Sequence, residues 1–450
     1  MEPTPLRATH YVMELVPDFG EGSLSATATL TVRNPSRRPV PEIPVLLYRL
    51  LKVTSIRDAG GVMSYRQHVV ALEDEPRQQV NAVTIRPSRP IPPGGVATFT
   101  LVYQGYLAGY EETGSLYIRD RIAPSFTILR TDAIAYPMIG VPSRRANHAA
   151  GFPEFDYRVG ITVPDSLTVA NGGRLIHRRS EGGRMTWTYG NLAPAWRMDF
   201  AIAPYRTRET PRGWIFHFPQ DSAGAVQVAE AVDQSLRLFT RWFGPPLGPA
   251  GFSVIEVPDG WGSQRDVTAI LQTASAFRDP ERLHEVYHEV SHAWHVKSLE
   301  PASPRLEEGL ASHLEVLASD SLLGGSRAAE RIEATVGWLR TLLERKPEFQ
   351  GIAMKDFGRR NVTDLSYSAG SVMFAILHRL VGEAAFREIV GGYHRRYHAT
   401  GGTTTQFVAH ASEVSPVNLT RFFDDWIESG AWSRHVLAGD SLDALVRRYR

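Results

Sequence analysis

Two histidines and a glutamate near the middle of the chain have the spacing of a metal site. Residues 288–292 read His-Glu-Val-Ser-His, an HExxH motif. Residues four apart lie on one face of a helix, so His288 and His292 can bind the same ion. Zinc suits such a pair, and Glu289 can act as general base towards a water at the ion. A catalytic zinc needs a third protein ligand and one open position, and Glu308 is the candidate for that third ligand.

A second HExxH motif overlaps the first, because residues 284–288 read His-Glu-Val-Tyr-His. Spacing does not choose between the two registers. About fifteen residues separate His292 from Glu308 and about eighteen separate His288 from Glu307, and either connection can close a site. In the downstream register, His284 is a neighbour of the site or a surface residue.

The surrounding residues carry a more specific pattern than the bare motif. His-Glu-Val-Ser-His-Ala-Trp at 288–294, followed by Glu-Gly-Leu-Ala-Ser at 308–312, resembles the HExxHxW…EGxAS pattern of the gluzincin zinc metallopeptidases. The resemblance is to the alanyl aminopeptidase/leukotriene-hydrolase family, and in part to the glycyl aminopeptidase family. It implies one Zn²⁺ per chain, bound by His288, His292 and Glu308, with Glu289 as base. The connection before Glu308 is somewhat shorter than is usual in the first family.

A tyrosine further along the chain matches another motif of that family. Residues 366–370 read Ser-Tyr-Ser-Ala-Gly and resemble a Tyr-x-Lys-Gly motif, with Ala369 in place of the lysine. The resemblance implies that Tyr367 donates a hydrogen bond to the oxyanion of the tetrahedral intermediate, as a phenol at a helix start can. The alternative is a buried tyrosine that packs under the helix. Glu315, two turns after Glu308, is a candidate partner for a ligand histidine.

Composition limits the class of protein. With 450 residues, 43% hydrophobic and 22% charged, the chain is expected to fold into two or three globular domains. The net charge of +1 gives no reason to expect nucleic-acid binding, and the absence of cysteine excludes disulfides, thiolate zinc sites and thiol nucleophiles. No signal peptide or membrane span is visible, so we expect a cytoplasmic protein without membrane insertion; a domain from a longer exported protein would also fit. The sequence does not indicate an oligomeric state.

The N-terminal part shows the period of two that is typical of half-buried strands. Apolar and polar residues alternate along 24–32, 97–103, 155–163, 185–189 and 198–202, with turn signals between the segments. We therefore expect residues 1–207 to form a β-sandwich or an open curved sheet, which the resemblance identifies as an N-terminal all-β saddle-like domain.

Helices dominate the second part of the chain. After a short strand at 214–218, helical spacing extends to Phe243, and strands are expected at 252–257 and 267–271. The zinc helix should start near Asp279 and Pro280, followed by helices at 304–322, 366–380, 383–397, 403–411 and 419–426. This order fits a thermolysin-like α/β catalytic domain at 208–450, so the predicted fold class is α+β and multidomain.

The expected reaction is zinc-dependent hydrolysis of peptide bonds in a peptide or protein, with aminopeptidase-like action. The family's Gly-x-Met-Glu-Asn strand, which binds the substrate ammonium group, is not matched at 259–264. Asp259, Asp266 or Glu307 would have to replace it. One alternative is a zinc endopeptidase without N-terminus recognition, which a comparison of free with N-acetylated peptide would distinguish. The other is a non-catalytic binding or scaffold protein that contains zinc.

Overall fold

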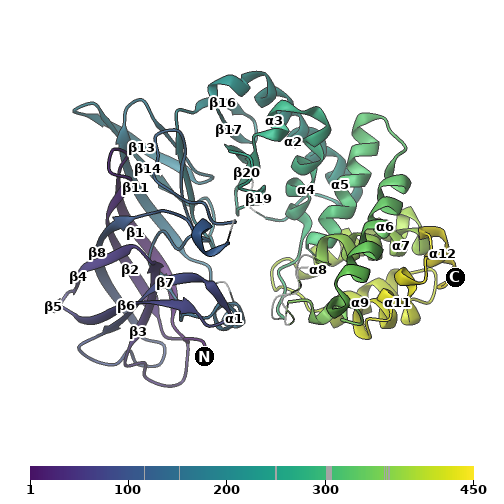
Figure 1. Cartoon of the computed structure of the whole chain (residues 1–450), viewed down its shortest axis with the longest axis horizontal. Coiled ribbons are helices and arrows are strands. Elements are labelled where there is room, and N and C mark those ends of the chain that lie inside the picture. Colours follow the sequence, from purple (N-terminus) through teal and green to yellow (C-terminus); the bar gives the residue numbers. More distant parts are fainter. Residues whose placement is uncertain are drawn as a thin grey trace. The chain divides into compact units, whose positions relative to one another are not determined.

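The computed structural model describes residues 1–115, 117–151, 153–248, 251–300, 307–358, 360, 362 and 365–450 (Figure 1). The chain forms two compact units. Unit 1 comprises Met1–Val226 and Pro249–Arg278, and unit 2 comprises Gln227–Gly248 and Asp279–Arg450. Residues 208–226 and 249–278, which the sequence assigned to the second domain, therefore belong to the same compact unit as the N-terminal part. The domain division at residue 207 stays a prediction.

Unit 1 contains the β-structure expected from the alternating pattern (Figure 1). Its largest sheet has eight strands, in the order β13 (Arg174–Glu181), β14 (Arg184–Gly190), β11 (Asp156–Pro164), β1 (Arg7–Asp18), β2 (Ser23–Arg33), β8 (Val96–Tyr106), β4 (Leu51–Asp58) and β5 (Gly61–Val62). Among the described residues of this sheet, β1 and β11 form the only parallel pair. The apolar residues of β2, from Leu24 to Val32, all point into the core, as the period of two predicts.

Two smaller sheets complete the N-terminal β-structure. One has the order β10 (Met138–Ile139), β3 (Ile43–Tyr48), β7 (Glu75–Arg86) and β6 (Ser64–Leu72). The other has the order β12 (Thr168–Ala170), β15 (Asp199–Ala203) and β9 (Thr127–Arg130). A six-residue helix, α1 (Arg144–Ala149), starts at the capping residue Ser143. The sequence pattern did not predict this helix.

A five-stranded mixed sheet follows in the chain and also belongs to unit 1. Its order is β16 (Arg206–Thr210), β17 (Gly213–His217), β18 (Ser253–Val257), β20 (Ala269–Thr273) and β19 (Gln264–Arg265), with β17, β18 and β20 parallel. Phe216 and Ile255 of this sheet share a core with Ile128 and Ala201 of the three-stranded sheet. This common core explains why the five-stranded sheet groups with the N-terminal part.

Unit 2 is built of helices, and it includes most of α2. Helix α3 (Ser275–Arg278) ends unit 1, and α2 (Ser222–Phe243) begins in unit 1 and continues into unit 2. The other helices of unit 2 are α4 (His284–Ser291), α5 (Glu308–Leu323), α6 (Ala328–Arg345), α7 (Leu365–Val381), α8 (Glu383–Tyr397), α9 (Thr404–Val414), α10 (Thr420–Phe423), α11 (Trp432–Leu437) and α12 (Leu442–Arg447). The predicted fold class, a β-sheet domain followed by a catalytic domain rich in helices, is confirmed.

Residues 301–306, where the second ligand helix was expected to start, lie outside the described residues, and α5 begins at Glu308. Helix α6 was missed, although Ile332, Val336, Leu339 and Leu343 are buried at helical spacing.

Helix α4 is held at both ends. Asp279 caps the preceding 3-10 turn, as predicted, and its side chain accepts a hydrogen bond from the Glu281 amide. At the other end, the indole of the fully buried Trp294 donates to the Gly244 carbonyl at 2.8 Å and packs edge-to-face on Phe239 of α2. The tryptophan of the HExxHxW pattern therefore fixes the end of the motif helix against α2.

Two glycines allow α5 and α7 to cross closely beside the candidate site. A Cβ on Gly309 would lie 2.6 Å from the Gly370 Cα and 2.9 Å from the Ser366 carbonyl oxygen, both backbone atoms. Backbone cannot move aside as a flexible side chain can, so this position requires glycine. Gly309 directly follows Glu308, so the crossing also sets where that carboxylate lies.

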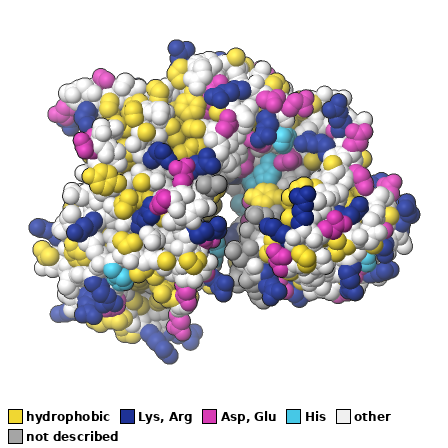
Figure 2. All heavy atoms as spheres, viewed as in Figure 1, with side chains coloured by type: hydrophobic (Ala, Val, Ile, Leu, Met, Phe, Trp, Pro, Cys, Tyr) yellow, Lys and Arg dark blue, Asp and Glu magenta, His cyan; other side chains and the backbone are white. Residues whose placement is uncertain are grey.

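The surface carries charges of both signs. Figure 2 shows lysine and arginine side chains interspersed with aspartate and glutamate over the visible face, which agrees with the net charge of +1. Within the described ranges, no helix combines the length and the apolar character that crossing a membrane requires.

Replacement of Gly309 by alanine should lower the thermal unfolding temperature, because the new methyl group forces α5 and α7 apart. Overpacking of this kind costs about 1–3 kcal/mol. Gly337→Ala in α6 is the matched control, since no described atom lies within 4 Å of a Cβ placed there. This control should be neutral or slightly stabilising. Equal melting temperatures for the two variants, measured by calorimetry, would contradict the role of the crossing.

Candidate active site

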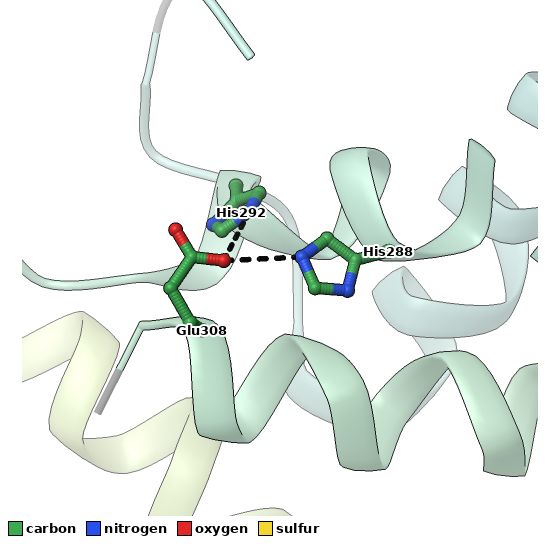
Figure 3. Close-up of side chains that lie close together, drawn as sticks. All are labelled: His288, His292 and Glu308. Atoms are coloured by element: carbon green, nitrogen blue, oxygen red, sulfur yellow. Dashed lines mark hydrogen bonds and ion pairs between the residues drawn. The ribbon is translucent and has the colours of Figure 1, made fainter. Parts of the chain in front are cut away.

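His288, His292 and Glu308 come together as the downstream register requires (Figure 3). One ligand atom from each lies within 4.8 Å of the other two. The Glu308 Oε2 is 3.2 Å from the His288 Nε2 and 3.7 Å from the His292 Nε2. The two rings have centroids 5.1 Å apart and come from α4 and the turn that ends it, whereas the carboxylate comes from the first residue of α5.

The upstream motif has a different environment. His284 is half-buried at the first position of α4, and its Nδ1 is hydrogen-bonded to the Glu281 carbonyl at 2.7 Å. Glu285 forms an ion pair with Arg282. His284 is not part of the metal-binding group found among the described residues. Geometry therefore favours the register that the family resemblance implied.

Each histidine of the group has a partner at its other ring nitrogen. The His288 Nδ1 is 2.9 Å from the Glu315 Oε2, which is the partner predicted for a ligand histidine. The His292 Nδ1 is 2.8 Å from the His295 Nδ1. The motif does not predict His295, although its position three residues after His292 is a signal in the sequence. Both contacts leave the Nε2 atoms directed at Glu308.

The electrostatics of the group favour a cation. Burial opposes protonation of His288, but hydrogen bonds to Glu308 and Glu315 and the negative charge of Glu289 outweigh it and raise its pKa well above the ordinary value. For Glu308, burial acts in the opposite direction and raises the pKa, but the contacts with His288, His292 and Tyr367 outweigh it and lower the pKa overall. Three carboxylates around two imidazoles give a field that attracts a positive ion.

Glu289 lies beside the metal-binding group without belonging to it. Its side chain is buried, with 5% of the residue exposed, and its Oε2 is 3.9 Å from the His292 Nε2. A carboxylate at this distance is within reach of a water molecule located between it and the group.

Tyr367 lies in the first turn of α7, with its ring stacked on that of His288 at a centroid distance of 6.1 Å. The side chain is 46% exposed, so the alternative of a tyrosine buried under the helix is wrong. Its hydroxyl is hydrogen-bonded to the Glu308 carboxylate, one of the contacts that lower the pKa of that group. The phenol therefore faces the metal-binding group from exposed surface.

The three acids considered for the substrate ammonium group differ in accessibility. Asp266 is 6% exposed, and burial together with the charge of Asp199 raises its pKa to about 7. A buried carboxyl of this kind is a poor contact for a substrate. Asp259 is exposed and accepts a hydrogen bond from the Ser275 amide, while Glu307 directly precedes Glu308.

The residues fit a catalytic zinc. Two imidazole nitrogens and one carboxylate oxygen are the donor set of a site with three protein ligands. The contacts of His288 and His292 at Nδ1 fix both rings with Nε2 towards the ion position, as ligand histidines generally require.

Comparison with known proteins shows that the metal-binding group lies within a segment that matches a known protein family. Residues 266–426 match the peptidase family M1 domain. The whole fold is similar to an M1 zinc metallopeptidase from Deinococcus radiodurans, with 19% identity, a TM-score of 0.68 and coverage of 96% of this chain and 93% of that one. A mutant from the same organism, bound to the substrate Tyr-Ser-Ala, has a TM-score of 0.70 at 19% identity, with 94% of each chain covered.

Yeast LTA4 hydrolase also shares the fold, at 12% identity and a TM-score of 0.70, over 95% of this chain and 68% of that one. No curated protein matched the sequence. The matched segment contains the HExxH residues, the downstream glutamate and Tyr367. Residues 266–426 therefore match the peptidase family M1 domain, which together with the metal-binding group supports a zinc metallopeptidase, and the chain resembles the alanyl aminopeptidase and leukotriene-hydrolase family of gluzincins.

Proposed function

We propose that the chain is an aminopeptidase-like enzyme that hydrolyses peptide bonds with one zinc ion, held by His288, His292 and Glu308. The observation that supports this most strongly is the convergence of their ligand atoms within 4.8 Å. When bound, zinc supplies Lewis acidity that polarises the scissile carbonyl and makes water more acidic. The residues of the chain orient the reactants and move the protons.

Glu289 acts as the general base in this proposal. It takes a proton from the attacking water and passes it to the leaving amine. Its burial and its distance of 3.9 Å from the His292 Nε2 support the role. In a non-catalytic zinc protein, Glu289 would have no task as a ligand, and a fourth protein ligand would normally complete the site.

Tyr367 acts as the hydrogen-bond donor to the oxyanion. Its exposed phenol contacts Glu308 and stacks on His288, so its hydroxyl lies next to the reacting carbonyl of a substrate bound at this group. A donor placed in advance stabilises the charge that develops in the transition state.

The substrate class is a peptide, and its N-terminus is the expected point of recognition. The tripeptide named for the Deinococcus relative supports short peptides as substrates. Of the three acids, Glu307 is the proposed partner of the substrate ammonium group, because it directly precedes Glu308 in the same unit. The Gly-x-Met-Glu-Asn motif is not matched in this chain, which is an argument for the endopeptidase alternative. Hydrolysis of a peptide should therefore be compared with that of its N-acetylated form, which an aminopeptidase would not cleave.

Glu289→Gln should retain zinc and lose turnover by about 10²–10⁴-fold, the usual contribution of a general base. The amide keeps the shape of the side chain and removes its ability to accept a proton. Turnover on a mixed peptide library and zinc content by atomic emission are the two measurements.

Glu285→Gln is the matched control for the general base, because it makes the same change in the overlapping motif one turn earlier on the helix. We expect this variant to have nearly the activity of the wild type. A reversed outcome would move the site to the upstream register.

Glu308→Ala should weaken zinc binding by more than Glu315→Ala does. Loss of a carboxylate that only supports a ligand histidine costs about 10–100-fold in metal affinity, and loss of a ligand costs more. Competition with a chromophoric chelator measures both affinities. Wild-type zinc affinity in the Glu308 variant would refute its assignment as the third ligand.

Tyr367→Phe should lower kcat by about 10²–10³-fold and change KM much less, because the hydroxyl is needed mainly in the transition state. Steady-state kinetics on one peptide separate the two constants. Tyr397→Phe in α8 controls for the loss of a hydroxyl elsewhere and should leave both constants unchanged. A change in KM alone would assign Tyr367 to substrate binding instead.

A further inference from the structure

A cavity of about 460 Å³ lies between α5, α6 and α7. We call it the α6 pocket. Its lining includes Glu315, Arg331, Trp338, Tyr367 and Ser368. Its volume is within the range of sites that bind small ligands or a substrate side chain.

The α6 pocket adjoins the metal-binding group. Tyr367 lines the pocket and also stacks on His288, while Glu315 lines it and accepts the His288 Nδ1 contact at 2.9 Å. Residues that support a proposed zinc ligand are therefore also part of the pocket. A peptide whose reacting carbonyl lay beside Tyr367 would reach the pocket, because Tyr367 belongs to both.

Arg331 is the cation of the pocket. It is half-buried, and its guanidinium has no ion pair or hydrogen bond to any side chain or carbonyl in the described part of the chain. In contrast, the guanidinium of Arg340 on the same helix has partners, since it donates hydrogen bonds to the carbonyls of Val436 and Asp440. A guanidinium without such partners, inside a pocket, is prepared to bind an anion in a bidentate manner.

A second polar group in the pocket also lacks a partner. The hydroxyl of Ser368 is buried, with 9% of the residue exposed, and it makes no hydrogen bond to any described residue. A buried hydroxyl without a partner costs free energy, so a ligand that bonds to it is favoured. Ser368 lies in the first turn of the 17-residue helix α7, whose amino end favours negative charge.

The remaining lining residues are compatible with an anionic substrate group. Glu315 contributes a negative charge, but its Oε2 is bound to His288 and the residue is not an ion-pair partner of Arg331. Trp338 follows Arg331 by seven residues on one face of α6 and is 53% exposed, so it offers an apolar surface beside the cation.

We propose that the α6 pocket binds a carboxylate of the peptide substrate, with Arg331 as its ion-pair partner and Ser368 as a hydrogen-bond donor. The proposal rests on the peptidase function proposed above and names its substrate class: peptides with a negative charge close to the scissile bond. The carboxylate can be the C-terminus of a short peptide or the side chain of an aspartate or glutamate.

Paired substrates separate these two sources. Trialanine and its C-terminal amide test the terminal carboxylate, and amidated peptides that differ by aspartate against asparagine beside the scissile bond test the side chain. The enzyme loaded with zinc should prefer the charged member of at least one pair. Arg331→Gln should raise KM for that member by about ten-fold or more, the usual effect of losing a charge-assisted hydrogen bond. The constants for the uncharged member should change less than about two-fold.

Two further variants control for indirect effects. Arg331→Lys keeps the charge but not the bidentate geometry, so it should retain part of the preference. Arg345→Gln, at the exposed end of α6 and outside the pocket lining, should behave as the wild type. Equal effects of Arg331→Gln on charged and uncharged peptides, or no effect on either, would overturn the proposal.

Calorimetric titration of the same peptides onto the wild type and Arg331→Gln makes the test independent of turnover. Tighter binding of the charged peptide that is lost in Arg331→Gln supports the pocket even if no peptide is cleaved. In that case the peptidase proposal fails and the carboxylate site stands. If peptides are cleaved but neither cleavage nor binding depends on their charge, the peptidase proposal stands and the carboxylate site is refuted.

Discussion

The imidazole of His288 is held at both nitrogens by carboxylates of a single helix. Glu308 faces its Nε2 and Glu315 its Nδ1, and these residues are seven apart on α5. Seven residues are about two helical turns, so both carboxylates lie on the same face of the helix. The ring can meet both only if α4 and α5 pack at one particular height and rotation. The rest of unit 2 can be understood as the structure that maintains this packing.

Close contacts between helices, rather than the connections between them, meet this requirement. Trp294 attaches the end of the motif helix to α2 through one hydrogen bond and an aromatic contact. Gly309 and Gly370 let the backbones of α5 and α7 approach closely, which brings Tyr367 over the His288 ring. Each contact combines a residue of the HExxHxW or EGxAS pattern with one from a distant part of the sequence. The patterns therefore carry packing information as well as chemistry.

Much of the fold and of the candidate site could be predicted from local patterns. Alternation predicted β2, β8 and β11, because one face of each strand is buried. Helical spacing placed His288 and His292 on one face of a helix, and the family resemblance chose Glu308 as the third member of the group that the structure brings together. Glu315 was a candidate partner for a ligand histidine, and it contacts His288. The residues concerned lie on one element, or on two neighbouring ones, with regular geometry, so local patterns are enough to bring them together.

Other features depend on geometry that no local pattern contains. The overlap of two HExxH motifs at His288 could not be resolved by spacing, since only the crossing of α4 with α5 decides which histidine meets Glu308. His295 follows the end of the helix, where the direction of a side chain is no longer set by the helical period. The pocket around Arg331 needs three helices to converge. Helix α6 is a different case, because the helical spacing of its buried apolar residues is present in the sequence.

The spacing of Glu308 and Glu315 has a consequence for how homologous sequences can vary in length. A single inserted or deleted residue between them would rotate one carboxylate by about 100° relative to the other, and His288 would lose one of its contacts. A change in length before Glu308 leaves that spacing intact, because the two carboxylates move together with α5. Gaps in an alignment should therefore be tolerated upstream of α5 and absent within its first two turns.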